Sequence, residues 1–262
     1  MDLKYNINIY FVYMLMTQHS IIILAGGDGK RMNSSKPKVC CLLGGKPLIV
    51  HIIERAIETE PKDIFIVVGK HKSQIQDTIS KSISFDITYV EQAIAKGTGH
   101  AVLCCLPYII CDNDDCKYLV LSGDVPLISR DLLVNLLNTN NNTIAVTYKD
   151  EPFGLGRVSK KSENTLDRII EEKDCNEEER QINLTNCGIY TLSLFDIKQT
   201  ILKIKNDNTQ KEFYLPDIFH YISEYSKVTL YYIPKSMQYT TNGVNTPEQL
   251  SELETTYSSL FN

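Results

Sequence analysis

The chain has 262 residues, of which 43% are hydrophobic and 23% are charged. These proportions are typical of a globular domain with a large core and argue against a disordered chain. The net charge of −5 argues against a broad nucleic-acid-binding face, because neutralising a phosphate backbone needs clustered Lys and Arg. We therefore expect no nucleic-acid partner, and we expect any bound phosphate to be small and locally held.

The first apolar segment, INIYFVYMLM at residues 7–16, is too short to span a bilayer. The TQHS that follows offers no small-residue pattern for signal-peptide cleavage, and Met14 and Met16 are alternative starts. We expect residues 1–19 to be an N-terminal extension that folding does not need, with a cleaved signal peptide as the alternative. One domain should then occupy residues 20–262.

From residue 21 onward, apolar runs alternate with segments of helical spacing. Strands are predicted at residues 21–25, 64–69, 87–90, 118–123 and 143–148, and helices at residues 47–58, 99–106, 131–137 and 247–260. Continuous apolar strands separated by helices predict an α/β fold with a doubly wound, mostly parallel sheet covered on both faces. After about Asp150 the strands become shorter and more polar. We expect this half to complete the sheet and to add a small antiparallel β lid.

The eight cysteines include no C-x-x-C pair. They are too sparse for a disulfide scaffold, and we expect them to be small core residues of a reducing compartment. This pattern favours a cytoplasmic location. Zinc is the weaker alternative, because no second His lies three or four residues from any of the five histidines.

The stretch IILAGGDGKRM at residues 22–32 joins a strand to a glycine loop. Glycines present backbone N–H groups without Cβ obstruction, and a concave row of such donors binds anions. The spacing is not that of a P-loop, because Arg31 follows Lys30. It is not a dinucleotide fingerprint either, because Met32 stands where the third glycine is needed.

Two cations, Arg31 and Lys38, remain on this loop and are able to close over a polyphosphate. A glycine turn with solvated charges is the alternative. Other polar clusters, at residues 91–100, 123–124, 154–157 and 186, follow predicted strands. Since ligands bind beyond the carboxyl ends of strands in a doubly wound sheet, we expect these clusters to converge.

A run of motifs then resembles one known family: LAGGDGKRMNSSKPK, VEQAIAKGTGHAV, LSGDVPLI, GLGR, IIEEKD, NCGIY, EFYLPDI and GVN. In this order, across roughly residues 21–260, they resemble the sugar-1-phosphate nucleotidyltransferases, most closely the uridyltransferase half of bifunctional enzymes that make UDP-N-acetylglucosamine. The resemblance implies a Rossmann-like nucleotidyltransferase fold. It also implies a UDP-N-acetylglucosamine pyrophosphorylase, which transfers UMP from UTP to N-acetylglucosamine-1-phosphate and releases pyrophosphate.

The resemblance also implies roles for individual residues. The nucleotide-binding positions are Leu24, Ala25, Gly26, Gly27, Gln92, Gly97 and Thr98. Arg31 and Lys38 would be catalytic, through the charge on the leaving pyrophosphate. Mg²⁺ would be the cofactor, held by Asp124 and Asn245. The sugar-binding positions would be Gly156, Glu171, Asn186 and Asn245.

The chain departs from the family pattern at four positions. Gly26 replaces the second of two alanines, Ser122 and Leu155 each replace a Tyr, and Pro216 replaces a Thr. The changes at Ser122 and Leu155 weaken the assignment of the sugar more than that of the reaction. A nucleotidyltransferase for another sugar-1-phosphate and a non-catalytic regulatory subunit therefore remain as alternatives.

No hexapeptide repeat follows the GVN motif and the last predicted helix. We therefore expect no acetyltransferase activity. The expected partners are UTP and N-acetylglucosamine-1-phosphate, with no membrane. The sequence is compatible with a homo-oligomer but does not specify one.

Overall fold

The computed structural model describes residues 19–261 except 33, 35, 112 and 164. The predicted N-terminal extension lies outside the described residues apart from His19, which already belongs to the first strand. Among the helices that the structure describes, none combines the length and apolar character needed to cross a membrane.

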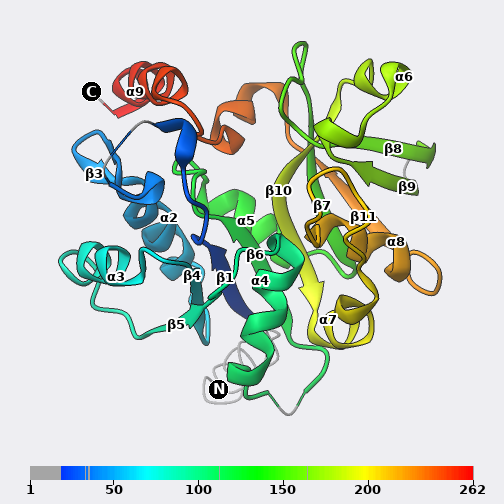
Figure 1. Cartoon of the computed structure of the whole chain (residues 1–262), viewed down its shortest axis with the longest axis horizontal. Helices are drawn as coiled ribbons and strands as arrows, with labels where there is room; N and C mark the ends of the chain where they lie inside the picture. The colour runs from blue at the N-terminus through cyan, green and yellow to red at the C-terminus, as the bar shows by residue number, and fades with distance from the viewer. Residues whose placement is uncertain (1–18, 33, 35, 112, 164, 262) are drawn as a thin grey trace, which may run out of the picture.

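One mixed sheet forms the centre of the described chain, with strand order β11-β7-β10-β6-β1-β4-β5 (Figure 1). The strands are β1 (His19–Leu24), β4 (Ile64–Val68), β5 (Ile87–Glu91), β6 (Lys117–Ser122), β7 (Asn142–Tyr148), β10 (Leu184–Ser193) and β11 (Val228–Tyr232). β10 runs antiparallel to both of its neighbours, whereas the other neighbouring pairs on this path are parallel. The predicted mostly parallel sheet is confirmed.

The central strands β1, β4 and β6 are buried on both faces because helices cover each side. The core on one face gathers side chains of α2 (Leu48–Ile57), α3 (Lys72–Ser80) and α5 (Arg130–Leu137). The core on the other face gathers those of α4 (Thr98–Cys105), α7 (Leu194–Thr200) and α8 (Ile218–Ile222). In β1, Ile21 and Ile23 point into the first core and Ile22 into the second, which explains the unbroken apolar run.

The antiparallel lid is the hairpin of β8 (Arg157–Ser162) and β9 (Thr165–Ile170), joined to the sheet where Arg157 pairs with Thr185 of β10. Figure 1 shows it on the opposite side of the molecule from α3. A short helix, α6 (Glu177–Arg180), follows it, and α9 (Pro247–Phe261) closes the described chain. A separate two-stranded sheet pairs β2 (Leu42–Leu43) with β3 (Lys46–Pro47).

β10 is irregular at the point where it meets the lid. Asn186 pairs with Val146, and Tyr190 pairs with Ile144. Between these two pairs β10 advances by four residues, whereas β7 advances by two. Gly188 lies inside this bulge with a φ of 68°, a left-handed conformation that glycine adopts without strain.

Cys111 and Cys116 pair across the turn before β6, where Cys116 N donates a hydrogen bond to Asn113 O. Cys116 is buried in one core and Cys111 packs against it, so both fit the prediction of core residues, whereas their pairing was not expected. The other six cysteines are free, and Cys40, Cys41, Cys105 and Cys175 are buried as predicted.

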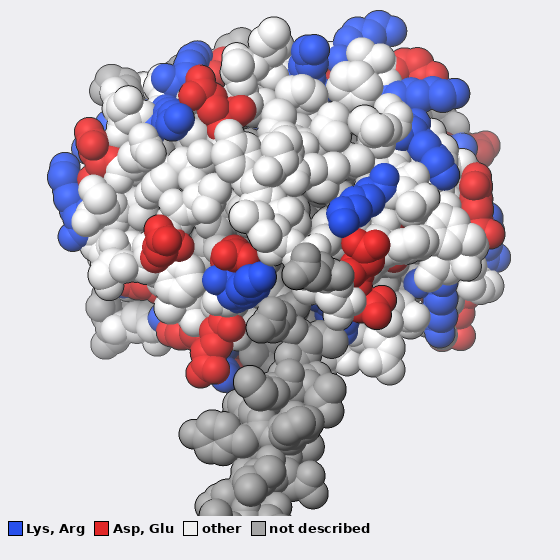
Figure 2. All heavy atoms as spheres, turned by 90° about the horizontal axis from the view of Figure 1, so that it is seen from below, with Lys and Arg blue, Asp and Glu red and all other residues white. Residues whose placement is uncertain are grey.

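Charges of both signs are interspersed on the face shown in Figure 2, without a continuous basic surface there.

The ends of β1 and β6 approach closely at one glycine. Gly123 N donates a hydrogen bond to Leu24 O at 2.9 Å. A Cβ added at Gly123 would lie 2.8 Å from the same oxygen, closer than such atoms pack. Gly123 therefore allows the two strand ends to stay together.

We predict that Gly123→Ala lowers the free energy of unfolding by about 1–3 kcal/mol, because the added methyl group overpacks this contact. The urea midpoint should fall accordingly. Gly27→Ala is the matched control, because a Cβ at Gly27 meets nothing within 4 Å. Equal midpoints for the two variants would contradict the prediction.

Candidate functional site

A cavity of about 570 Å³ opens beyond the carboxyl ends of the central strands. Every residue predicted to bind nucleotide lines it: Leu24, Ala25, Gly26, Gly27, Gln92, Gly97 and Thr98. Arg31, Lys38, Asp124 and Asn245 line the same cavity. The structure thus brings together residues that are spread over more than 200 positions of the chain.

The glycine loop leaves the sheet at the end of β1. Ala25 N still pairs with Val67 O at 2.8 Å, so the loop starts from a fixed position. Gly29 turns the chain with a φ of 59°, and a Cβ there would lie 2.7 Å from that of Lys38. The loop and the residue that follows Pro37 are therefore packed against each other.

Lys38 connects the two predicted metal-binding residues. Its Nζ donates a hydrogen bond to Asp124 Oδ2 and another to Asn245 Oδ1, the latter at 3.0 Å. Arg31 Nη2 donates to the same Asn245 oxygen at 3.2 Å. The oxygens of Asp124 and Asn245 therefore converge on one positive centre.

Neighbouring groups hold both oxygen ligands in place. Ser122 Oγ donates to Asp124 Oδ1 at 2.7 Å, which leaves Oδ2 turned toward Lys38. Val244 N donates to Asp124 O at 2.9 Å, and Asn245 N donates to Gln249 Oε1 at 2.7 Å. The segment that carries Asn245 is thus fixed both to the end of β6 and to α9.

This arrangement suits a magnesium ion. Carboxylate and amide oxygens are hard ligands, and magnesium in nucleotide sites takes one or two protein ligands and completes its shell with phosphate oxygens and water. Within the described residues, no group of three or more His, Cys, Asp or Glu side chains could hold a metal ion. The oxygens of Asp124 and Asn245 therefore fit an ion whose remaining ligands come from a phosphate substrate and water.

Gln92 lies at the opposite wall of the cavity and is 7% exposed. Its Nε2 donates to Gly97 O at 3.0 Å and lies 3.0 Å from His100 Nδ1. Burial, and then the charge of Lys96, lowers the pKa of His100, which favours the neutral imidazole. The amide orientation of Gln92 is thus set by two partners.

The turn after Gln92 is closed by the EFYLPDI segment. Gly97 has a φ of 102°, and a Cβ there would lie 2.5 Å from Phe213 O. Thr98 Oγ1 accepts a hydrogen bond from Leu215 N at 2.9 Å. The motif at residues 212–218 therefore supports the cavity wall.

The predicted sugar-binding residues form a second cluster beside the cavity, on the lid side. A Cβ added at Gly156 would lie 3.3 Å from Glu171 Oε1 and 3.6 Å from Asn186 Cβ. Asn186 Nδ2 donates to Tyr190 OH at 2.7 Å across the β10 bulge. Gly156, Glu171 and Asn186 are together, but they do not line the cavity of the nucleotide residues. Of the predicted sugar-binding residues, only Asn245 does.

Burial and acidic neighbours raise the pKa of two carboxyl groups in and beside this cluster. Burial, and then the charges of Asp217 and Asp174, raises the pKa of Glu171 to about 7. Burial, followed by Asp174 and Asp207, raises the pKa of Asp217 to about 6. Glu212, which also contributes to the shift of Glu171, lines the nucleotide cavity. The two sites are therefore electrostatic neighbours.

Among the polar residues that line the cavity, Ser122 and Glu212 were not assigned a role from the sequence. The hydrogen bond from Ser122 to Asp124 was not predicted, because the family motif marks this position only as a departure from Tyr. Glu212 was hidden among many surface acids, although it opens the EFYLPDI motif. Its place beside a recognised motif was the available signal.

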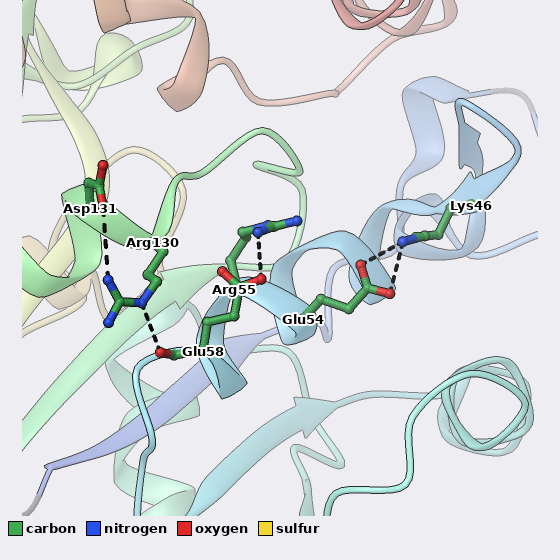
Figure 3. Close-up of polar contacts among 6 residues, drawn as sticks. All are labelled: Lys46, Glu54, Arg55, Glu58, Arg130 and Asp131. Carbon is green, nitrogen blue, oxygen red and sulfur yellow. Dashed lines mark hydrogen bonds and ion pairs between the residues drawn. The ribbon is translucent and has the colours of Figure 1, made fainter. Parts of the chain in front are cut away.

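A second cavity of about 470 Å³ lies between α2, the start of α5 and α9. Figure 3 shows that its charged residues pair with one another: Lys46 with Glu54, and Arg55 with Glu58, whose backbone oxygen accepts from Arg130 Nε at 3.0 Å. Its charges are therefore largely satisfied within the protein.

Comparisons with known proteins agree with this geometry. The family model of the MobA-like NTP transferase domain matches residues 21–193. A protein of Acanthamoeba polyphaga mimivirus named "Probable UDP-N-acetylglucosamine pyrophosphorylase" is 38% identical over 242 residues, which cover 89% of this chain and 94% of that protein.

The bifunctional protein GlmU of Francisella tularensis subsp. novicida is also 38% identical, over 90% of this chain. The chain spans 50% of that relative's length. Among solved structures, a UDP-glucose pyrophosphorylase in complex with UDP-glucose aligns with a TM-score of 0.74 at 19% identity, covering 93% of this chain and 99% of that one. At this identity the likeness shows the fold alone, which is that of the nucleotidyltransferases, as predicted. The chain belongs to the family of MobA-like NTP transferases.

Proposed function

We propose that the chain is a UDP-N-acetylglucosamine pyrophosphorylase, which transfers UMP from UTP to N-acetylglucosamine-1-phosphate and releases pyrophosphate. The observation that carries the proposal is the convergence of Lys38, Asp124 and Asn245 at one side of a cavity whose rim is the glycine loop. The mimivirus relative and the matching half of GlmU support the same reaction. A cytoplasmic location is part of the proposal.

The nucleotide would enter the cavity with its base toward Gln92 and its phosphates along the glycine loop. Gln92 donates through Nε2 within the protein, so its carbonyl oxygen is the atom that would accept from the base. Backbone groups of Gly97 and Thr98 would complete the base site. Backbone N–H groups of Gly26 and Gly27 would contact phosphate oxygens.

The proposed reaction needs the two substrates to be aligned and the charge on the leaving pyrophosphate to be stabilised. The attacking phosphate oxygen of the sugar phosphate is already anionic at neutral pH, so no general base has to remove a proton. Arg31 and Lys38 would stabilise the charge that develops on the leaving pyrophosphate. Both cations donate to Asn245 Oδ1, which supports a shared role at the leaving group.

Asp124 and Asn245 would hold the magnesium ion, which would supply Lewis-acid stabilisation to the reacting phosphate groups. For these oxygens to bind it, Lys38 Nζ must release them, and the triphosphate offers the ammonium new anionic partners. Asn245 would then also contact the sugar phosphate. Gly156, Glu171 and Asn186 would contact the sugar, with the loop from Gly154 near the N-acetyl group.

The test is a pyrophosphate-release assay with purified protein, magnesium, each of the four NTPs and a panel of sugar-1-phosphates. We expect release with UTP and N-acetylglucosamine-1-phosphate, and loss of release when a chelator removes magnesium. Preference for glucose-1-phosphate or another NTP would favour a different nucleotidyltransferase, in line with the changes at Ser122 and Leu155. No release with any pair would favour a regulatory subunit.

We predict that Lys38→Ala lowers kcat by about 10²- to 10³-fold, because it removes a charged contact that strengthens in the transition state. The KM for N-acetylglucosamine-1-phosphate should change far less. Lys36→Ala removes an exposed charge two residues away and is the control. Equal losses in kcat and in sugar-phosphate affinity would contradict the role of Lys38.

We predict that the KM for N-acetylglucosamine-1-phosphate falls as the pH rises from 6 to 8. Since the pKa of Glu171 is raised to about 7, this carboxyl group ionises in that range, and a carboxylate accepts a sugar hydroxyl more strongly than a neutral acid. The ionised fraction grows about tenfold between these pH values. Ionisation of the substrate phosphate affects all variants alike, so Glu171→Gln should show a smaller fall.

The same group gives a readout that is independent of activity. Between its unfolded value of 4.5 and about 7, the folded state binds more protons than the unfolded state, so stability should fall as pH rises through this window. Glu171→Gln should flatten that slope in urea unfolding. An unchanged slope would contradict the raised pKa.

A further inference from the structure

The lid approaches the predicted sugar site through the short loop Gly154-Leu155-Gly156, and one buried cation holds that loop. Arg157, the first residue of β8, is 2% exposed. Its Nη1 donates a hydrogen bond to Leu155 O, and its Nη2 pairs with Glu172 Oε2 at 2.7 Å. The guanidinium therefore ties the loop to the segment after β9.

Glu172 completes the connection. The oxygen that pairs with Arg157 also accepts a hydrogen bond from Gly154 N at 3.2 Å. Arg157 and Glu172 thus fix two successive backbone positions, one through its carbonyl and one through its N–H. Gly154 has a φ of 76°, and this left-handed turn is held in place at the same time.

The held loop borders the predicted sugar contacts. Gly156 follows it directly, and a Cβ there would lie 3.3 Å from Glu171 Oε1. Glu171 is the neighbour of Glu172 in the chain. Any shift of the Arg157–Glu172 pair therefore moves both sides of the gap between Gly156 and Glu171.

The burial of this pair makes its geometry stringent. The side chains of Arg157 and Glu172 are 3% and 20% exposed, and a buried charge that loses its partner is strongly disfavoured. Arg157 Nε has no hydrogen-bond partner among the described residues. The orientation of the guanidinium thus depends on Glu172 and Leu155 O.

We propose that Arg157 and Glu172 are positioning residues for the sugar phosphate. They do not touch it; they set the loop at residues 154–156 against Glu171. This inference rests on the proposed function, because it assigns that gap to the sugar. Its effect should appear in sugar-phosphate binding and not in UTP binding, since neither side chain lines the nucleotide cavity.

The lid contains a matched control. Arg168 of β9 pairs with Glu179 of α6 at 2.6 Å, but its side chain is 59% exposed. Among the described residues, neither side chain hydrogen-bonds to the loop at residues 154–156. Arg168→Gln removes one charge from the lid, as Glu172→Gln does. Only Glu172→Gln should weaken the contacts that fix the loop at residues 154–156.

The experiment compares wild type, Glu172→Gln, Arg157→Lys and Arg168→Gln by steady-state kinetics. We expect Glu172→Gln and Arg157→Lys to raise the KM for N-acetylglucosamine-1-phosphate by about tenfold to a hundredfold. The lysine loses the two-pronged geometry of the guanidinium. The KM for UTP should stay within about twofold of the wild-type value, and Arg168→Gln should match wild type. Equal changes in both KM values, or the same behaviour in Arg168→Gln, would overturn the proposal.

Hydrogen exchange of the backbone amides at residues 153–157 separates this proposal from the proposed function. We expect faster exchange in Glu172→Gln than in Arg168→Gln. The urea midpoints of global unfolding should be similar for the two variants. Unchanged exchange would overturn the positioning role even if the enzyme is active. Faster exchange in a protein that shows no transfer would overturn the proposed function and leave the hold on the loop confirmed.

Discussion

Two oxygen acceptors at close range repel each other, and a cation between them offsets this repulsion. Between Asp124 and Asn245 this cation is Lys38, which donates to both. Three segments from the beginning, middle and end of the chain are joined in this way. The cavity exists because these segments meet, and its walls follow from the strand ends and helices that bring them there.

The sheet, the lid and many of the residues that line the cavity could be predicted from the sequence. The unbroken apolar runs predicted strands buried on both faces, and this is confirmed for the central strands. The shorter and more polar strands after Asp150 predicted the lid, which is also confirmed. α3 was not identified, because Ile75 and Ile79 are its only buried residues in the described structure and two positions do not form a clear stripe. Motif order predicted which residues would share a cavity, as the glycine loop and Asn245 illustrate.

Other features depend on contacts that no local pattern encodes. The pKa of Glu171 follows from burial and from acids that are distant in the chain. The pairing of Cys111 and Cys116 depends on the path of a turn. The pair of Arg157 and Glu172 joins residues fifteen positions apart, and only the register of the β8–β9 hairpin brings them together. Such tertiary geometry decides how the lid meets the cluster of Gly156, Glu171 and Asn186.

The bulge in β10 has a consequence for how this chain tolerates change in length. Since the side chains of a strand alternate between its faces, the two additional residues between Asn186 and Tyr190 leave both side chains on one side. Deleting a single residue there would turn Asn186 to the other face and separate it from Gly156 and Glu171. Removing two residues together would keep Asn186 on the face that carries Gly156 and Glu171.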